Sequence, residues 1–205
     1  MKNLLLICRE GLNRSPAAAA IFGRELEERG YFANVTAAGI EKPKDGASSR
    51  LTSVMFDKGY RGFGDREKRT ILLTPTLIDK ADLILTMTSD QRDCLLENFP
   101  AATQRLFTLA NYATNGKDNF SIEHLDPRVL SMGHPHSNEE YSHQAEVASW
   151  LPNILARYYL HFFADGAYSS RDHSGLIRPV EKMVRKMEKY VPLAVNRMKK
   201  EGFFN

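Results

Sequence analysis

A cysteine and an arginine separated by five residues, Cys8 and Arg14, form the pattern in this chain that is best suited to chemistry. The residues between them are Arg9, Glu10, Gly11, Leu12 and Asn13. If this segment joins a strand to a helix, its backbone N–H groups can surround an anion, and the guanidinium can bind two oxygens of a phosphate group. The same positive field favours the thiolate form of the cysteine, which is the nucleophilic form. The pattern therefore predicts a phosphate-binding loop with a cysteine nucleophile.

Two small residues could support this chemistry. The hydroxyl of Ser15 can turn toward the sulfur and stabilise it, but a serine in this place can equally be the cap of the following helix. Gly11 can adopt the positive φ that a loop wrapped around an anion requires. Without this context, a lone cysteine at the end of a core strand would be a buried, inert thiol.

An alternation of apolar runs and helical patterns surrounds this segment. Residues 3–7 form an apolar run that is too short for a helix and predicts a buried strand. Further strands are expected at residues 33–38, 82–87 and 105–109, and helices at residues 17–29, 50–58 and 89–99. Strands that alternate with helices predict a parallel α/β sheet with helices on both faces and a ligand site at the carboxyl ends of the strands. Cys8 would lie at such an end.

The second half of the chain is less regular. Residues 113–137 are rich in Gly, Asn, Asp and Pro and predict a long loop, followed by a helical stretch at residues 139–163. After a hinge at residues 166–175, residues 179–200 predict an amphipathic helix. From Gly166 onward nine Lys or Arg stand against four Asp or Glu, so this helix is basic. Its apolar face could pack back on the domain, or it could mediate a dimer or partner contact.

Composition narrows the class of protein. The chain has 205 residues, a net charge of +3 and two cysteines, Cys8 and Cys94, which is too few for a disulfide framework. No stretch approaches the roughly 18 to 20 apolar residues of a transmembrane helix, and the apolar start is too short for an export signal. We therefore expect a cytoplasmic globular protein. The loop histidines match no metal motif and are assigned no role; these are His124, His134 and His136.

Residues 4–16, LLLICREGLNRSP, resemble the signature of the low-molecular-weight protein-tyrosine phosphatase family. Residues 37–40 resemble its short Ser-Ala-Gly-Thr stretch, residues 81–87 resemble its third strand, and Asp126-Pro127 resembles its general-acid loop. The resemblance covers residues 1–164 as one α/β domain. It leaves residues 165–205 as a hinge plus a C-terminal helical extension.

This resemblance implies a four-stranded parallel sheet flanked by helices and a metal-independent, two-step hydrolysis of phosphate monoesters with no cofactor. Cys8 would attack phosphorus and form a phosphocysteine, while Arg14 and Ser15 stabilise the reacting groups. Asp126 would protonate the departing oxygen and then deprotonate the attacking water. A phosphorylated protein or a small phosphate ester would be the substrate, and no nucleic acid is expected as a partner.

The chain departs from the family pattern at positions that bear on the substrate. Glu10 and Gly11 stand where typical members have Gly and Asn. Arg128 follows the Asp-Pro pair, where members that act on phosphotyrosine have aromatic residues. Arg9 and Arg128 favour a substrate with additional negative charge, so we expect either protein phosphotyrosine or another, acidic, phosphorylated substrate.

Two other functions are compatible with the same loop. A thiol-dependent arsenate reductase would need a resolving thiol, for which Cys94 is the available residue. The alternative for Cys94 is that it lies on a helix and packs into the core of the domain. A phosphate-binding or adaptor protein without turnover is a third hypothesis, which the anionic Glu10 favours and the complete set of Cys8, Arg14, Ser15 and Asp126 opposes.

Overall fold

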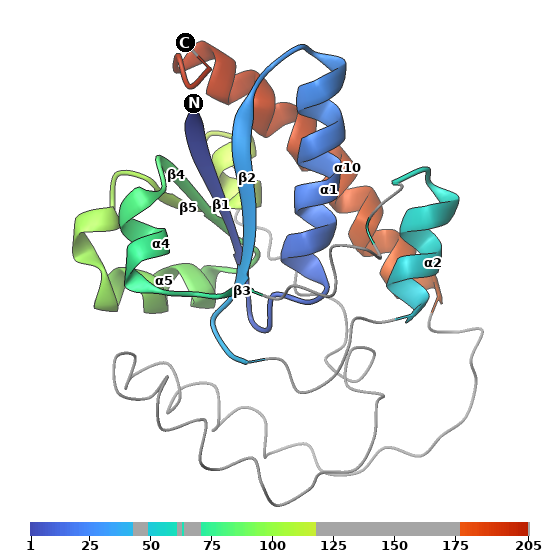
Figure 1. Ribbon diagram of the computed structural model, residues 1–205, viewed down its shortest axis with the longest axis horizontal. Coiled ribbons are helices and arrows are strands. Elements are labelled where there is room, and N and C mark those ends of the chain that lie inside the picture. Colours follow the sequence, from blue (N-terminus) through green and yellow to red (C-terminus); the bar gives the residue numbers. More distant parts are fainter. Residues whose placement is uncertain (43–48, 61–62, 64–70, 118–176, 205) are drawn as a thin grey trace, which may run out of the picture.

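The computed structural model describes residues 1–42, 49–60, 63, 71–117 and 177–204. Its centre is a parallel sheet with the strand order β3-β2-β1-β4-β5 (Figure 1). The strands are β1 (Lys2–Cys8), β2 (Ala33–Gly39), β3 (Ile71–Leu72), β4 (Leu83–Thr86) and β5 (Leu106–Thr108). Since β1 pairs with both β2 and β4, the strand that ends at Cys8 lies in the middle of the sheet.

The predicted parallel α/β class is confirmed, although the sheet has five strands instead of four. All four strands expected from the apolar runs are present, with bounds that shift by at most one residue at each end. The additional strand, β3, has two residues and pairs with the end of β2. A strand of this length carries no measurable periodicity, which is why the sequence pattern missed it.

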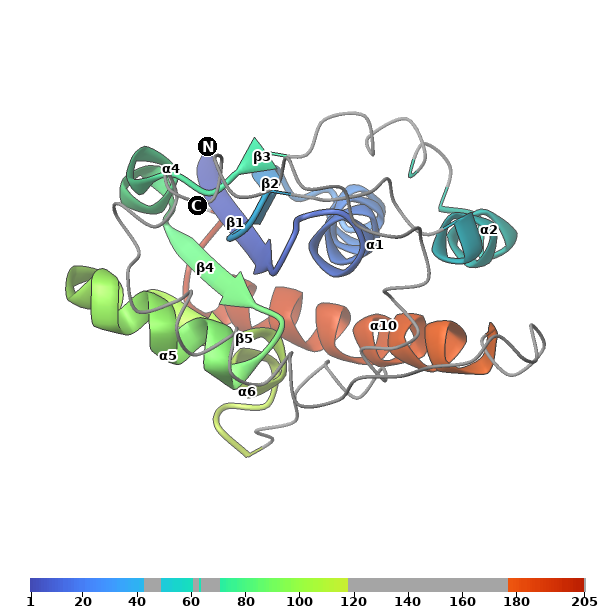
Figure 2. The same ribbon diagram turned by 90° about the horizontal axis from the view of Figure 1, so that it is seen from below.

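Helices cover both faces of the sheet. They are α1 (Arg14–Glu28), α2 (Ser49–Asp57), α4 (Pro75–Lys80), α5 (Ser89–Asn98), the 3-10 helix η1 (Pro100–Ala102), α6 (Leu109–Ala113) and α10 (Ile177–Lys200). Side chains alternate along a strand. Leu4 and Leu6 of β1 therefore join the cluster formed with α1, α6 and α10, whereas Leu5 and Ile7 join the one formed with α4 and α5. Figure 2 shows these two layers on opposite sides of the strands.

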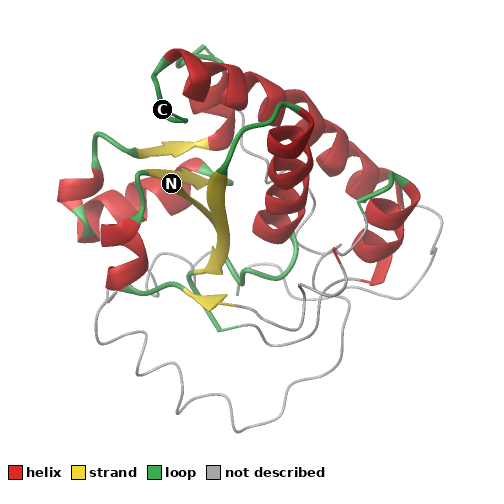
Figure 3. Ribbon diagram, turned by 45° about the horizontal axis from the view of Figure 1, so that its top comes forward, coloured by secondary structure: helices red, strands yellow, loops and turns green. Residues whose placement is uncertain are grey.

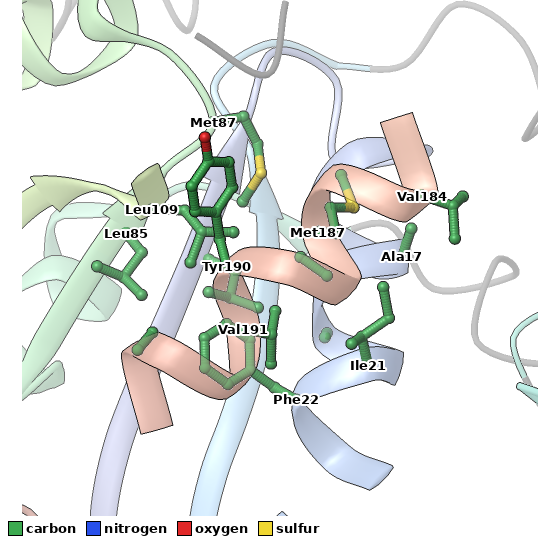
Figure 4. Packing of buried hydrophobic residues seen from close by; sticks show 14 of the residues in the cluster. Ala17, Ile21, Phe22, Leu85, Met87, Leu109, Val184, Met187, Tyr190 and Val191 are labelled. Carbon is green, nitrogen blue, oxygen red and sulfur yellow. The ribbon is translucent and has the colours of Figure 1, made fainter. Parts of the chain in front are cut away.

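The C-terminal helix α10 completes the core on one side of the sheet. It packs along α1 and also contacts α2 and α6 (Figure 3). The apolar side chains along one face of this helix are buried in the cluster that contains Cys8, and Val191 lies beside Phe22 of α1 (Figure 4). The interpretation that the apolar face packs back on the domain is thus confirmed. Any dimer or partner contact of α10 is left to its exposed side.

Several predicted segments lie outside the described residues. These are most of the loop at residues 113–137, the helical stretch at residues 139–163, the hinge at residues 166–175 and the domain boundary at residue 164. The helix predicted as an extension shares its core with α1. In the part of the chain that the structure describes, no helix combines the length and the apolar character needed to cross a membrane.

Candidate active site

Cys8 is the last residue of β1, and α1 begins at Arg14. Residues 8–14, which we call the cysteine loop, therefore connect the central strand to the first helix at the carboxyl edge of the sheet. The burial of β1 explains why the loop starts here, because Leu4 to Ile7 are at most 2% exposed and anchor the strand between two cores. The predicted order of strand, tight loop and helix is present, with the orphan N–H groups of the first helical turn at the loop.

Two glycines allow the cysteine loop to pack directly on the end of β2. Gly11 has φ +66°, and a Cβ atom added there would lie 2.6 Å from the backbone nitrogen of Gly39. A Cβ atom on Gly39 would lie 2.3 Å from the carbonyl carbon of Glu10, which is far inside van der Waals contact. The positive φ expected for Gly11 is thus confirmed, and both positions require glycine.

Hydrogen bonds from two neighbouring strands hold the backbone around Cys8. The N–H of Ile40 donates to the carbonyl of Cys8 at 3.1 Å, and the N–H of Met87 donates to the carbonyl of Ile7 at 3.1 Å. These bonds continue the ladders that β1 makes with β2 and β4 past the ends of those strands. The backbone at the sulfur-bearing residue is therefore fixed from both sides.

Ser15 contacts the sulfur. Its Oγ atom lies 3.0 Å from the Sγ atom of Cys8 and donates to the carbonyl of Ala38 at 3.2 Å. Both side chains are buried, at 0% exposed for Ser15 and 2% for Cys8. The cap position of α1 is Asn13, so the alternative in which Ser15 is the helix cap is wrong. Ser15 is the second residue of α1, and its hydroxyl faces the strands.

Arg14 and Leu12 are both buried, at 8% and 4% exposed. Leu12 contributes an apolar side chain to the interior, so its expected role in binding substrate would rest on its backbone. Arg14 is the first residue of α1 and brings a cation to the helix N-terminus. A guanidinium that is taken out of water in this way interacts strongly with an anion.

Arg9 is paired with a residue that the sequence analysis did not identify. Its Nε atom lies 2.9 Å from the Oε2 atom of Glu41, just beyond β2. The prediction that Arg9 attracts additional negative charge on a substrate did not include this partner. Sequence reasoning also missed three residues as parts of the site, namely Ala38, Gly39 and Glu41. The one signal for them in the sequence was the predicted strand that ends just before Gly39.

The remaining predicted residues are separated from this arrangement or lie outside it. Asp126, Arg128 and the three histidines fall outside the described residues. Cys94 is buried on α5 in the cluster on the opposite face of the sheet from Cys8, which agrees with core packing and not with a resolving thiol. Within the described ranges no group of three His, Cys, Asp or Glu side chains could hold a metal ion.

The sequence matches the family described as "Low molecular weight phosphotyrosine protein phosphatase" over residues 3–147. The chain therefore belongs to this family, as its loop signature indicated. It is a cysteine-dependent phosphatase, since the named relatives of this family are protein phosphatases.

Two relatives illustrate the range of the similarity. A protein-arginine-phosphatase of Bacillus subtilis is 28% identical over 126 residues, which are 61% of this chain and 79% of the relative. A protein of Ralstonia nicotianae named "Probable low molecular weight protein-tyrosine-phosphatase EpsP" is 29% identical over 159 residues, which are 76% of this chain and 98% of the relative.

Solved structures share the fold. YwlE arginine phosphatase from Geobacillus stearothermophilus has a TM-score of 0.63 and 21% identity, covering 99% of this chain and 96% of that chain. A cysteine-to-serine mutant of YwlE arginine phosphatase with a phosphorylated active site serine has a TM-score of 0.65 and 19% identity, covering 99% of both chains. At this level of identity, the similarity establishes the arrangement of strands and helices.

Proposed function

We propose that this phosphatase acts on phosphorylated proteins through a phosphocysteine intermediate at Cys8. The observation that carries the proposal is the 3.0 Å contact between Sγ of Cys8 and Oγ of Ser15, at a loop that joins the central strand to a helix N-terminus. A buried sulfur with a hydroxyl beside it and orphan N–H groups around it is suited to attack on a phosphoryl group. The phosphorylated active site serine in the YwlE mutant supports phosphoryl transfer to this position.

In the first step the thiolate of Cys8 attacks phosphorus, a P–S bond forms, and the bond to the leaving atom breaks. The loop N–H groups and the guanidinium of Arg14 stabilise the charge on the three equatorial oxygens. The backbone N–H groups of residues 9–13 supply these donors, including those of Gly11, Leu12 and Asn13, while the side chains of Arg9 and Glu10 border the loop. Asp126 donates its proton to the leaving atom.

In the second step water attacks the phosphocysteine. The Asp126 carboxylate takes a proton from the water, the new P–O bond forms, and the P–S bond breaks to return the thiolate. Ser15 supports both steps, because its single hydroxyl proton can turn from the Ala38 carbonyl toward the thiolate when the sulfur carries charge. The proposal includes no metal ion or cofactor.

The substrate class follows from the relatives and from the loop. The relatives named above include protein-arginine and protein-tyrosine phosphatases, so we propose phosphoarginine and phosphotyrosine in proteins as the two candidate groups.

We also propose that the protein is located in the cytoplasm. Partner contacts would use the exposed side of α10, with Lys182, Arg185 and Lys189, because its apolar side is buried.

The experiment that tests this function is steady-state hydrolysis of two aryl phosphates, para-nitrophenyl phosphate and phenyl phosphate, in the presence of a chelator. Cys8→Ser should abolish turnover of both, and Cys94→Ser should leave it unchanged. Asp126→Ala should slow phenyl phosphate more than para-nitrophenyl phosphate, since phenolate is the poorer leaving group and depends more on an acid, which typically contributes 10²–10⁴-fold. Asp79→Ala, an exposed carboxylate on α4, is the control. Turnover that survives Cys8→Ser would refute the proposal.

A further inference from the structure

Glu41 holds the cysteine loop through both its backbone and its side chain. Its N–H donates to the carbonyl of Arg9 at 2.8 Å, and its carboxylate accepts from Nε of the same residue at 2.9 Å. The side chains are 27% exposed for Arg9 and 17% for Glu41. The pair is therefore partly shielded from water, and the backbone hydrogen bond holds the two residues opposite each other.

The pair also sets the net charge of the groups in and beside the cysteine loop. Arg9 and Arg14 bring two positive charges, and Glu10 and Glu41 bring two negative charges. Arg14 is buried at the start of α1, whereas the Arg9–Glu41 pair is partly exposed. A substrate that enters the loop thus meets a buried cation for its phosphate and a neutral pair beside it.

We propose that Glu41 is a specificity-determining residue, which neutralises Arg9 and so prevents the enzyme from favouring phosphorylation sites with acidic flanks. The proposal rests on the proposed function, because it assumes that the phosphoryl group is bound by the cysteine loop. The Cα atom of Arg9 is about 3.8 Å from that of Cys8, as for any consecutive residues. The Arg9–Glu41 pair therefore borders the place where a phosphoryl group on Cys8 would lie, and at 0.1 M salt charges act over about 10 Å.

The two members of the pair should have opposite effects when they are neutralised one at a time. Glu41→Gln keeps the backbone bond to Arg9 and removes one negative charge, so acid-flanked substrates should gain affinity relative to base-flanked ones. Arg9→Gln leaves the carboxylate unneutralised and should shift the preference the other way. One unit charge at this range is worth roughly 0.5 to 1.4 kcal/mol at a high effective dielectric constant, which corresponds to about a twofold to tenfold change. The double variant should return to the ratio of the parent protein.

The test measures binding in the Cys8→Ala background, which removes the nucleophile without leaving a hydroxyl that could be phosphorylated. Fluorescence anisotropy gives the Kd of labelled peptides that carry one phosphotyrosine or one phosphoarginine, flanked by four Glu or by four Lys. Variants are Glu41→Gln, Arg9→Gln and the double variant. Glu28→Gln is the matched control, because it makes the same change in net charge at the far end of α1, roughly 21 Å along a helix that rises 1.5 Å per residue.

We expect the ratio of Kd values for Lys-flanked and Glu-flanked peptides to rise twofold to tenfold in Glu41→Gln, to fall in Arg9→Gln and to be restored in the double variant. The shifts should shrink at 0.5 M salt, and Glu28→Gln should show none of them. Peptides that bind with an unchanged ratio in all variants, or an equal loss of affinity for both flanks, would overturn the role of Glu41 alone. A complete lack of binding by every phosphopeptide would overturn the proposed function and this inference with it.

Discussion

The Sγ atom of Cys8 and the Oγ atom of Ser15 are 3.0 Å apart, although Ser15 stands seven positions further along the chain. The distance results from the geometry of the cysteine loop, which leaves β1 at Cys8 and enters α1 at Arg14, so that the second helical residue faces back toward the strand end. A hydroxyl at this place can accept from a thiol and donate to a thiolate. The contact therefore links the fold directly to the chemistry of the sulfur.

Replacing Ser15 with alanine should lower kcat and leave the fold intact. A hydrogen bond to a charged group contributes about 1.5 to 3 kcal/mol, so kcat should fall about tenfold to a hundredfold. Steady-state hydrolysis of para-nitrophenyl phosphate measures this loss. Ser89→Ala, at the start of α5, is a control at a similar position after a strand and should change kcat less than twofold. An equal effect of the two substitutions would contradict a role for Ser15 at the sulfur.

Glycine at position 39 should be essential for activity. In Gly39→Ala the new Cβ atom would collide with the carbonyl carbon of Glu10 at 2.3 Å and must displace the cysteine loop. We expect a loss of more than a hundredfold in kcat/KM with a folded protein by circular dichroism, because a displacement of about 1 Å at a reacting centre can cost this much.

The matched control for Gly39→Ala is Gly23→Ala, in the middle of α1, where an added Cβ atom meets nothing within 4 Å. Alanine is the better helix former by about 0.5 to 1 kcal/mol, so this variant should unfold at a higher denaturant concentration with unchanged activity. Full activity in Gly39→Ala would mean that the contact between β2 and the loop does not position the site.

The C-terminal helix should be required for the stability of the whole domain. Met187 is 0% exposed in the main core, and Met187→Ala should cost about 2 to 5 kcal/mol of unfolding free energy. Leu193→Ala removes a side chain of similar size on the same helix, but Leu193 is 40% exposed and should lose less than about 1 kcal/mol. Urea titrations followed by circular dichroism compare the two. Similar losses in both variants would contradict the packing of α10 on α1.

The Tyr60–Glu188 hydrogen bond makes stability depend on pH in the alkaline range. Burial, followed by the hydrogen bond from the Tyr60 hydroxyl to Glu188, raises the pKa of Tyr60 from 10.0 to about 12. Because the pKa of Tyr60 is higher in the folded state, the contribution of its protonated hydroxyl to the unfolding free energy is complete below about pH 10. This contribution is lost as the pH rises toward 12. The unfolding free energy should therefore decrease over this window.

Tyr60→Phe tests this linkage, since it removes the titrating hydroxyl and keeps the ring beneath Arg24, whose guanidinium carbon is 4.0 Å from the ring centroid. Urea titrations at pH 8 to 11.5 should show a smaller alkaline decrease in this variant than in the wild type. Tyr31→Phe, whose ring stacks on Phe204 at 4.5 Å, serves as the control. Parallel pH profiles for the wild type and Tyr60→Phe would contradict the assignment.

Local patterns in the sequence were sufficient to predict the longer strands and the first helix, but not the contacts between them. The four longer strands follow from apolar runs that end at glycines, polar residues or helix starts, and α1 follows from its alanine-rich composition. Ser15 was ambiguous because a serine before a proline is equally typical of a helix cap, and only the position of Arg14 as the first helical residue resolves the two roles.

Contacts between distant segments could not be predicted in this way. The apolar stripe of α10 shows that it buries one face, but not that this face meets α1, which ends at Glu28, far earlier in the chain than the start of α10 at Ile177. Glu41 follows β2 without any motif, and its pairing with Arg9 depends on the parallel register of β1 and β2, which aligns Cys8 with Gly39. Such pairings depend on tertiary structure, which the periodicity of a sequence does not predict.

The most direct test of the central claim is to locate the phosphoryl group during turnover. Wild type and Asp126→Ala are mixed with para-nitrophenyl phosphate, quenched with acid within milliseconds and analysed by peptide mass spectrometry. The account predicts a phosphorylated peptide that contains Cys8, in larger amounts in Asp126→Ala because the attack of water is slowed, and no modification of the peptide that contains Cys94. Phosphate release at full rate without a phosphorylated Cys8 peptide in either protein would contradict the account.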